Sequence, residues 1–256
     1  MVGSINSNFF KTVKLIIQYD GTNYYGWQSQ KDENTIQDSI HNAIKKIFPT
    51  QSIKLIGAGR TDSGVHAIGQ VAHIKLNTEF SEKELKKAIN GNLNNHDIWI
   101  KNCNYEPDDF HARFSAIKRE YIYNITLDFN PLSRNIFYYY KYKIDFDLLC
   151  DCAKLLLGEH DFSLFSKLNP EVKNKICIVE SSFWEKHNNK FKFTIKANRF
   201  IHHMVRFLVG TMLEVSRGRY KVGNFLDLIN NKITTNIVAV KAPSKGLILS
   251  QVFYED

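Results

Sequence analysis

Segments with the period of a strand alternate with segments with the period of a helix over the first 105 residues, and this alternation limits the possible folds most. In residues 12–19, apolar side chains recur at every second position, as in a strand with one buried face. Residues 36–47 place isoleucines three and four positions apart and end before Pro49, as a helix does. The order of segments predicts an open sheet covered by two helices. Strands are expected at 12–19, 53–56, 70–76 and 98–103, and helices at 36–47 and from Ser81 through Ile89.

Capping residues mark the start of both predicted helices. Asn34, followed three residues later by Gln37, is expected to be the N-cap of the first helix. Ser81 and Glu84 have the spacing of a capping box, in which each side chain bonds the backbone N–H of the other residue. The sequence therefore predicts where both helices begin.

The second half of the chain also mixes strands and helices, after a polar junction. Residues 105–109 contain Pro107 and two aspartates and separate two patterned halves. We therefore predict an α+β protein of two domains, residues 1–108 and 109–256. In the second domain, strands are expected at 121–127, 136–142, 176–185, 191–197 and 247–254, and helices at 147–158, 198–216 and 224–229.

A glycine-rich stretch between two predicted strands is the candidate catalytic loop. Gly57, Gly59 and Gly64 allow backbone conformations that a Cβ forbids, and Arg60 and Asp62 lie between them. The stretch is not a Walker-type phosphate loop, because no Gly-Lys-Ser/Thr follows. The tripeptide that starts at Asp62 matches the Asp-Ser/Thr-Gly of aspartic proteases. Those enzymes need two copies at one site and the chain has only one, so the protease is retained only as an alternative.

Composition restricts the partner and the compartment. The net charge of +8 and the pI near 9.1 indicate an acidic partner, and nucleic acid is the commonest one. No stretch approaches the roughly 20 apolar residues that span a bilayer, and the N-terminus lacks a secretory signal pattern, so we expect a cytoplasmic protein that does not contact a membrane. None of the four cysteines forms a CxxC pair, and no other cluster of metal ligands is visible. We expect reduced cysteines and no metal site.

The predicted helix at 198–216 is apolar around most of its circumference but carries four basic or titratable residues. Arg199, His202, His203 and Arg206 stand at i, i+3, i+4 and i+7, which would align them on one face. A buried arginine without an anionic partner costs several kcal/mol. We therefore expect a buried arginine of this group to have a partner, and Asp62 and a substrate phosphate are the candidates. A solvated edge of the helix is the alternative.

Residues 57–67, Gly-Ala-Gly-Arg-Thr-Asp-Ser-Gly-Val-His-Ala, resemble nearly residue for residue the signature loop of the TruA family of tRNA pseudouridine synthases. The resemblance covers nearly the whole chain in family order. Further matching blocks are residues 19–21, 25–28, 109–116, 121–123, 157–162, 197–206 and 246–247. The resemblance implies the pseudouridine synthase fold, in which two related domains, each a mostly antiparallel mixed sheet covered by helices, enclose an active-site cleft.

The resemblance also implies a reaction and its partners. Uridine at position 38, 39 or 40 of the tRNA anticodon stem-loop would be isomerised to pseudouridine. In this reaction the N1–C1′ bond breaks, the uracil turns, and C5 bonds to C1′. The family needs no metal, redox partner or organic cofactor. The implied partners are tRNA and a second copy of the chain in a homodimer.

Five residues of this sequence match positions with roles in the family. Asp62 matches the essential aspartate, which attacks the nucleotide or assists departure of the uracil. Arg60 matches the arginine that takes the place of the flipped-out base, and Tyr121 the tyrosine that stacks on the target uracil. Arg206 matches the helix arginine that pairs with the aspartate, and Leu247 an apolar wall of the uracil pocket. On its local pattern alone Tyr121 would be a core tyrosine. A non-catalytic tRNA-binding protein with the same fold is the remaining alternative.

Overall fold

The structure, a computed structural model, describes residues 10–93, 96–167, 174–232 and 236–255. The strands are β1 (Phe10–Tyr19), β2 (Ile56–Gly57), β3 (His66–Asn77), β4 (Ile98–Glu106), β5 (Ala116–Thr126), β6 (Tyr138–Tyr139), β7 (Gly158–Asp161), β8 (Ile176–His187), β9 (Lys190–Ala197) and β10 (Leu247–Tyr254). The helices are α1 (Ile36–Ile47), α2 (Glu82–Asn92), α3 (Phe146–Lys154), α4 (Met204–Ser216) and α5 (Val222–Ile229).

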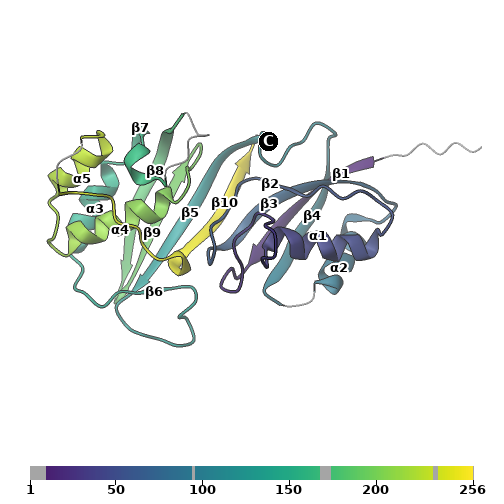
Figure 1. Cartoon of the computed structure of the whole chain (residues 1–256), viewed down its shortest axis with the longest axis horizontal. Coiled ribbons are helices and arrows are strands. Elements are labelled where there is room, and N and C mark those ends of the chain that lie inside the picture. Colours follow the sequence, from purple (N-terminus) through teal and green to yellow (C-terminus); the bar gives the residue numbers. More distant parts are fainter. Residues whose placement is uncertain (1–9, 94–95, 168–173, 233–235, 256) are drawn as a thin grey trace, which may run out of the picture.

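Within the described residues, the strands form one ten-stranded sheet along an elongated molecule, with helices α1 and α2 at one end and α3 to α5 at the other (Figure 1). The order along the sheet is β4-β1-β3-β10-β5-β9-β8-β7, and β2 and β6 pair with β3 and β5. Two of the strand pairs are parallel, β3 with β10 and β5 with β6. The mixed sheet with its helices confirms the predicted α+β class.

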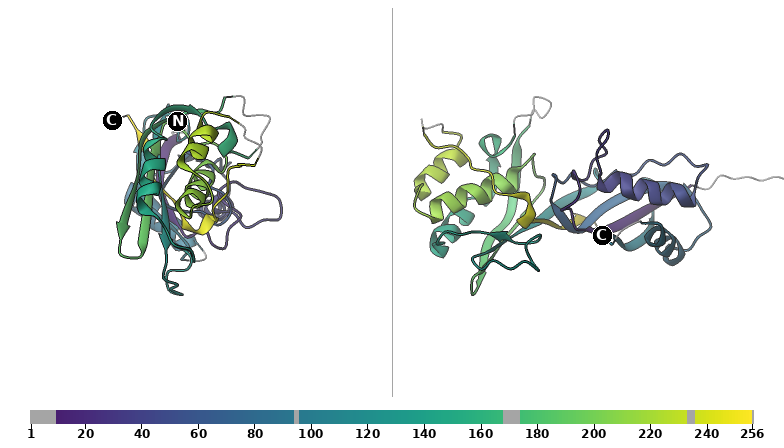
Figure 2. Two further views of the ribbon diagram at one scale, coloured as in Figure 1. Left: turned by 90° about the vertical axis from the view of Figure 1, so that its left-hand side faces the viewer. Right: turned by 60° about the horizontal axis from the view of Figure 1, so that its bottom comes forward.

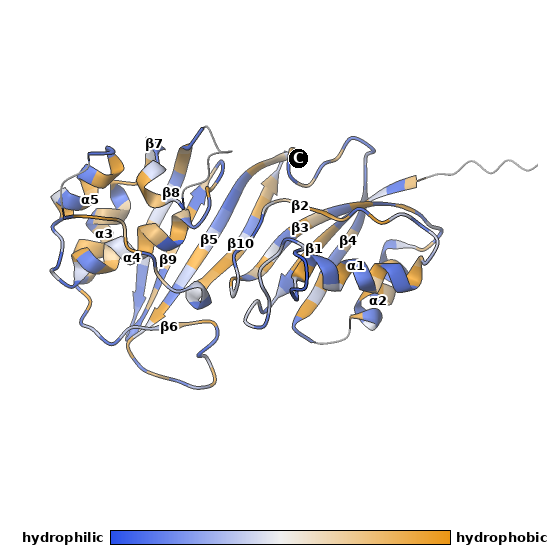
Figure 3. Cartoon of the chain, viewed as in Figure 1, coloured by the Kyte–Doolittle hydropathy of each residue, from blue (hydrophilic) through white to orange (hydrophobic). Residues whose placement is uncertain are grey.

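The N-terminal half packs α1 and α2 against strands β1, β3 and β4. Helix α1 buries Ile36, Ile40 and Ile44 at the predicted helical spacing. Its N-cap is Thr35 rather than the predicted Asn34, because the Thr35 side chain accepts the backbone N–H of Asp38. In α2, Ser81 and Glu84 form the predicted capping box. Figure 3 shows both polar and apolar positions on α1 and α2, as expected for helices with one buried face.

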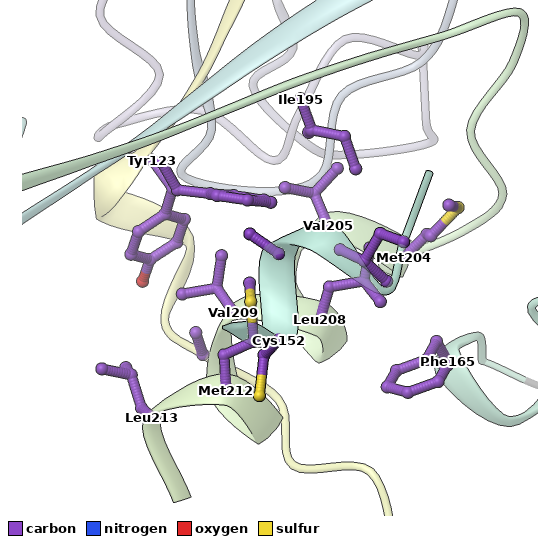
Figure 4. Packing of buried hydrophobic residues seen from close by; sticks show 14 of the residues in the cluster. Tyr123, Cys152, Phe165, Ile195, Met204, Val205, Leu208, Val209, Met212 and Leu213 are labelled. Carbon is purple, nitrogen blue, oxygen red and sulfur yellow. The ribbon is translucent and has the colours of Figure 1, made fainter. Parts of the chain in front are cut away.

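The C-terminal half buries a second core between α3, α4, α5 and the strands β5, β8 and β9. Nearly all of α4 is buried, and its side chains pack among Tyr123, Cys152 and Phe165 (Figure 4). Figure 2 shows the helices of this half gathered beside the sheet. The four cysteines are free thiols, three of them buried, as predicted. Burial raises the pKa of Cys177 to about 11, so its thiol is neutral at pH 7.

The last strand, β10, joins the two halves into one sheet. It runs parallel to β3, with Ile248 and Leu249 opposite His66 and Ala67, and antiparallel to β5 on its other side. Leu249 and Val252 belong to the N-terminal core although they are at the far end of the sequence. The two cores therefore lie on one continuous sheet. The boundary between residues 108 and 109 stays a prediction.

Some predicted element boundaries differ from the structure. Strand β3 begins at His66, so the end of the glycine-rich stretch is strand rather than loop. The strand expected at 136–142 is reduced to Tyr138–Tyr139, and α3 starts after Asp145, which caps it. The helix expected from residue 198 begins only at Met204. Among the described residues, none of the helices is long and apolar enough to cross a membrane.

Candidate active site

The loop that carries Asp62 is held against the segment after β1 by backbone contacts. The N–H of Trp27 donates to the carbonyl of Thr61 at 3.1 Å, and the N–H of Gly64 donates to the carbonyl of Tyr24 at 3.2 Å. Gly26 has a φ of 89°, and a Cβ there would lie 2.5 Å from the Thr61 carbonyl oxygen. Only glycine permits this close approach, so the segment before α1 shapes the catalytic loop.

Buried polar side chains hold the same loop from beneath. The hydroxyls of Tyr19 and Thr61 lie 2.8 Å apart, and both residues are buried. The side-chain amide of Gln70 on β3, which is fully buried, donates to the carbonyl of Gly59 at 3.0 Å. Burial raises the pKa of Tyr19 well above 10, so its phenol is neutral and available for hydrogen bonding. The loop is therefore a fixed frame around Asp62.

The Asp62 carboxylate meets three side chains from a segment about 140 residues away. Its Oδ2 lies 2.6 Å from His203 Nδ1 and 3.1 Å from Arg206 Nη1, which donates to it. Its Oδ1 lies 3.5 Å from His202 Nε2. The Asp62 side chain is 17% exposed, and those of His203 and Arg206 are 12% exposed. Oδ2 is thus occupied, whereas within the described parts of the chain Oδ1 has only the longer contact.

These neighbours keep Asp62 ionised. Burial alone would raise the pKa of this carboxyl group. The hydrogen bonds and charges of His203 and Arg206 outweigh burial, and the pKa lies below its ordinary value of 3.8. An ionised acceptor at 2.6 Å requires a proton on His203 Nδ1. Partial burial, with the charge of His203, lowers the pKa of His202. The site therefore presents a carboxylate anion at neutral pH.

Arg206 is held in place by the segment that follows α5. Its Nε donates to the carbonyl of Ala242 at 2.9 Å, and its own carbonyl accepts the N–H of Ala242 at 2.9 Å. Gly210, one turn further along α4, allows this approach, because a Cβ there would clash with the carbonyl oxygen of Val240. The expected pairing of Arg206 with Asp62 is found in the structure.

The predicted polar stripe on a helix is wrong, although three of its four residues gather at Asp62. Helix α4 starts at Met204, so Arg199 and His202 precede it and His203 is its N-cap. His203 has a φ of 67°, a left-handed conformation that costs most residues about 1–2 kcal/mol. This turn brings His203 and Arg206 to the same carboxylate oxygen. The two histidines were named in that stripe but not among the predicted site residues. Their sequence signals were the i, i+3, i+4 and i+7 spacing and the matching block at 197–206.

The other predicted site residues lie around this cluster without contacting the carboxylate in the described structure. Arg60 is exposed and its Nε donates to Gln28 at 3.1 Å. The ring of Tyr121 on β5 packs edge-on against Phe200 at 5.0 Å, and burial, with the charge of Asp62 among other causes, raises its pKa. Leu247 is 5% exposed at the start of β10, opposite Tyr123.

Asp62, His202 and His203 could in principle ligate a cation, because their ligand atoms lie within 4.8 Å of one another. The sequence showed no such cluster, since its members are far apart in the chain. Two ligands bound to one tetrahedral Zn²⁺ would be about 3.3 Å apart, given bonds of about 2.0 Å. The 2.6 Å contact between His203 and Asp62 instead has the length of a hydrogen bond. Arg206 also donates to the same oxygen, so the cluster is better described as an ion-pair network.

The network also differs from the site of an aspartic protease. There, two carboxylates lie close enough to share a proton, and one of the two pKa values is raised. In the described structure, the neighbours of the Asp62 carboxylate are an arginine and two histidines, and its pKa is lowered. The geometry therefore argues against the protease alternative.

Comparison with known proteins identifies the family of this chain. A family model described as tRNA pseudouridine synthase matches residues 15–115 and 152–255. A tRNA pseudouridine synthase A of Acetivibrio thermocellus is 38% identical over 95% of this chain and 100% of its own length. At the same coverage, tRNA pseudouridine synthase A 2 of Clostridium perfringens is 37% identical. These matches place the chain among the pseudouridine synthases, a class of isomerases. Within that class it belongs to the TruA family.

Proposed function

We propose that the protein isomerises uridine to pseudouridine at position 38, 39 or 40 of the tRNA anticodon stem-loop, with Asp62 as the essential aspartate. The observation that carries this proposal is the Asp62 carboxylate, which is largely buried yet ionised. His203 and Arg206 occupy its Oδ2, and among the residues that the structure describes Oδ1 keeps only a 3.5 Å contact with His202. Oδ1 is therefore the oxygen that faces the nucleotide.

The proposed reaction rearranges bonds within one nucleotide, and its atoms and electrons balance without a second reactant. The N1–C1′ bond breaks and a C5–C1′ bond forms within one nucleotide, and the proton displaced from C5 ends on a ring nitrogen. Electrons are neither gained nor lost, so the chemistry requires no redox partner. An ionised carboxylate serves both proposed routes, attack on the nucleotide and assistance to the departing uracil. Arg206 keeps Asp62 ionised and fixes its orientation.

Three further residues complete the proposed substrate site. Tyr121 lies on the central strand β5, close enough for Asp62 to affect its pKa, and we assign its ring to stacking on the uracil. Arg60 is an exposed residue of the loop that carries Asp62. We assign its guanidinium to the position vacated by the flipped-out base. Leu247, beside Tyr123, is assigned to the apolar wall of the pocket.

The remaining parts of the proposal concern partners and location. The net charge of +8 suits a protein that holds tRNA phosphates, and binding should weaken as salt rises. From the family resemblance we also propose that the protein is a homodimer and lies in the cytoplasm. Light scattering of the purified protein tests the dimer.

The decisive experiment is to map pseudouridine in unmodified tRNA transcripts after incubation with the purified protein. We expect modification at positions 38 to 40 by the wild type and none by Asp62→Asn, which keeps the size of the side chain but cannot ionise. Binding of tRNA should persist in Asp62→Asn. The matched control is Asp151→Asn, on the exposed side of α3, where Asp151 makes a surface ion pair with Lys154.

Two results of this experiment would contradict the proposal. Wild-type protein that binds tRNA without forming pseudouridine would support the non-catalytic alternative. Full activity of Asp62→Asn would remove Asp62 from the mechanism.

A further inference from the structure

Arg119 stands at the point where the two halves of the molecule meet, outside the group that contacts Asp62. It lies on β5, two residues before Tyr121, and is paired across the sheet with Val252 on β10 and Ala197 on β9. Its side chain is partly buried between the catalytic loop and the segment after β9. Neither the proposed chemistry nor the substrate contacts make use of it.

The guanidinium of Arg119 makes four hydrogen bonds, and all of them end on main-chain carbonyls. Its Nη1 donates to Ala116 at 3.0 Å and to Asn198 at 3.1 Å. Its Nη2 donates to Ala58 at 3.2 Å and to Arg113 at 3.0 Å. The N–H groups of both terminal nitrogens are therefore used. None of these four bonds goes to a carboxylate, so among the described residues the guanidinium is bonded by carbonyl dipoles.

The carbonyls come from the segments that build the active site. Ala58 belongs to the loop that carries Asp62, four residues further on. Asn198 begins the segment that carries His203 and then Arg206. These two segments converge on the Asp62 carboxylate, and Arg119 bonds one residue near the base of each. A single rigid group thus bonds both segments close to the point where they meet at Asp62.

This arrangement needs a guanidinium and not merely a positive charge. A partly buried cation without an anionic partner is costly, and partial burial lowers the pKa of Arg119. The planar fork of arginine holds four acceptors in fixed directions, whereas the single nitrogen of lysine is a point donor on a flexible stem. A lysine would leave carbonyls of the catalytic loop or of the segment after β9 without a donor.

We propose that Arg119 is a positioning residue that locks the Asp62 loop of the N-terminal half to the His203 and Arg206 segment of the C-terminal half. It acts through those residues and does not touch the substrate. The inference that Arg119 affects the rate of pseudouridine formation rests on the proposed function. The inference that Arg119 holds the Asp62 loop to the segment of His203 and Arg206 rests on the geometry alone.

The test compares Arg119→Lys with Arg134→Lys in the full-length protein. Arg134 is an exposed arginine whose guanidinium bonds only the Pro131 carbonyl of its own loop among the described contacts, so its replacement keeps the charge and leaves the lock intact. For both variants we measure kcat and KM on tRNA transcripts, and hydrogen–deuterium exchange of the free protein.

For Arg119→Lys we expect kcat to fall about 10- to 100-fold with little change in KM, because misplacement by about 1 Å is enough for such a loss. Exchange should quicken in peptides covering 57–65 and 198–206 and stay unchanged in α1. Arg134→Lys should behave as the wild type in both measurements. Unchanged kcat, or faster exchange spread evenly along the chain, would overturn the proposal.

A second variant covers the case in which Arg119→Lys does not fold. Arg119→Ala is assayed with and without ethylguanidinium at low-millimolar concentration, and we expect the added guanidinium to restore part of kcat and of the protection at 57–65. Failure to restore either would contradict the positioning role. If the wild type forms no pseudouridine, the proposed function fails, and the exchange measurements still decide whether Arg119 locks the two segments.

Discussion

At the residue scale, the two carboxylate oxygens of Asp62 differ in their hydrogen-bond partners, and this difference defines the site. Oδ2 carries the hydrogen bond from Arg206 and the short contact with His203, whereas the contact found for Oδ1 in the described structure is the longer one of 3.5 Å with His202. Hydrogen bonds to an ionised acceptor are about twice as strong as neutral ones. These partners therefore keep the Asp62 carboxylate ionised and fix its orientation.

The role of Arg206 can be tested through the pH profile. Arg206→Gln removes one cause of the lowered Asp62 pKa, so this pKa should rise and the acid limb of kcat/KM should move to higher pH. We expect kcat at neutral pH to fall about 100-fold, since one electrostatic partner is lost. Kinetics from pH 4 to 8 measure both effects.

A control separates the ion pair from net charge. Arg219→Gln removes an equal charge at an exposed position near Glu214. It should leave the pH profile in place. An acid limb that stays unmoved in Arg206→Gln would show that Arg206 does not set the charge of Asp62.

At the element scale, α4 determines where Arg206 and His203 lie. The helix is buried around most of its circumference, and the segment at Val240 and Ala242 passes directly over Gly210. This contact fixes the Ala242 carbonyl that holds Arg206 Nε. The close packing at Gly210 is thus linked to the orientation of Arg206 toward Asp62.

Two glycine substitutions test this packing. Gly210→Ala places a methyl group against backbone that cannot move aside, and should lower the free energy of unfolding by about 2–3 kcal/mol and reduce kcat. Gly223→Ala in α5 adds the same methyl group in open space. It should raise the free energy of unfolding by less than about 0.5 kcal/mol. Urea unfolding of the two variants measures the difference. Equal stability would mean that α4 and the 240–242 segment adjust freely.

At the scale of the whole molecule, β10 and His66 join the two halves. Strand β10 supplies Leu249 and Val252 to the N-terminal core. His66 on β3 lies with Nε2 2.7 Å from the Asn135 carbonyl and 3.1 Å from that of Lys245, both in the C-terminal half. The Asp62 carboxylate and its partners therefore approach one another across a junction made of strand pairing and hydrogen bonds.

This junction predicts that the N-terminal half is not stable alone. A fragment of residues 1–108 loses β10 and leaves the edge of β3 that pairs with it exposed. It also loses the buried side chains of Leu249 and Val252, worth about 1.5–3 kcal/mol each, and that of Ala112. Against a total stability of about 5–15 kcal/mol, we expect an unfolded or aggregating fragment. Circular dichroism with urea titration of the fragment and of the whole chain provides the comparison. Cooperative unfolding of the fragment at the urea midpoint of the whole chain would instead support an independent domain.

Much of the fold could be predicted because local patterns carry it. Ile36, Ile40 and Ile44 repeat with the period of a helix, and Ser81 with Glu84 forms the expected capping box. The catalytic loop could be found from the spacing of its glycines, and the family resemblance identified Asp62 and Arg206. Errors occurred where competing local signals were nearly equal, as between Asn34 and Thr35 at the start of α1.

The sequence by itself determined the alternation of strands and helices, the loop at Asp62, and the need of Arg206 for an anionic partner, because each depends on residues close together or on a charge that cannot be buried alone. Only the tertiary structure decided that His202 and His203 share that partner, that α4 begins after them, and that Arg119 bonds both converging segments. These features depend on contacts between residues 58–62 and 198–206, and local periodicity carries no information about contacts across such a separation.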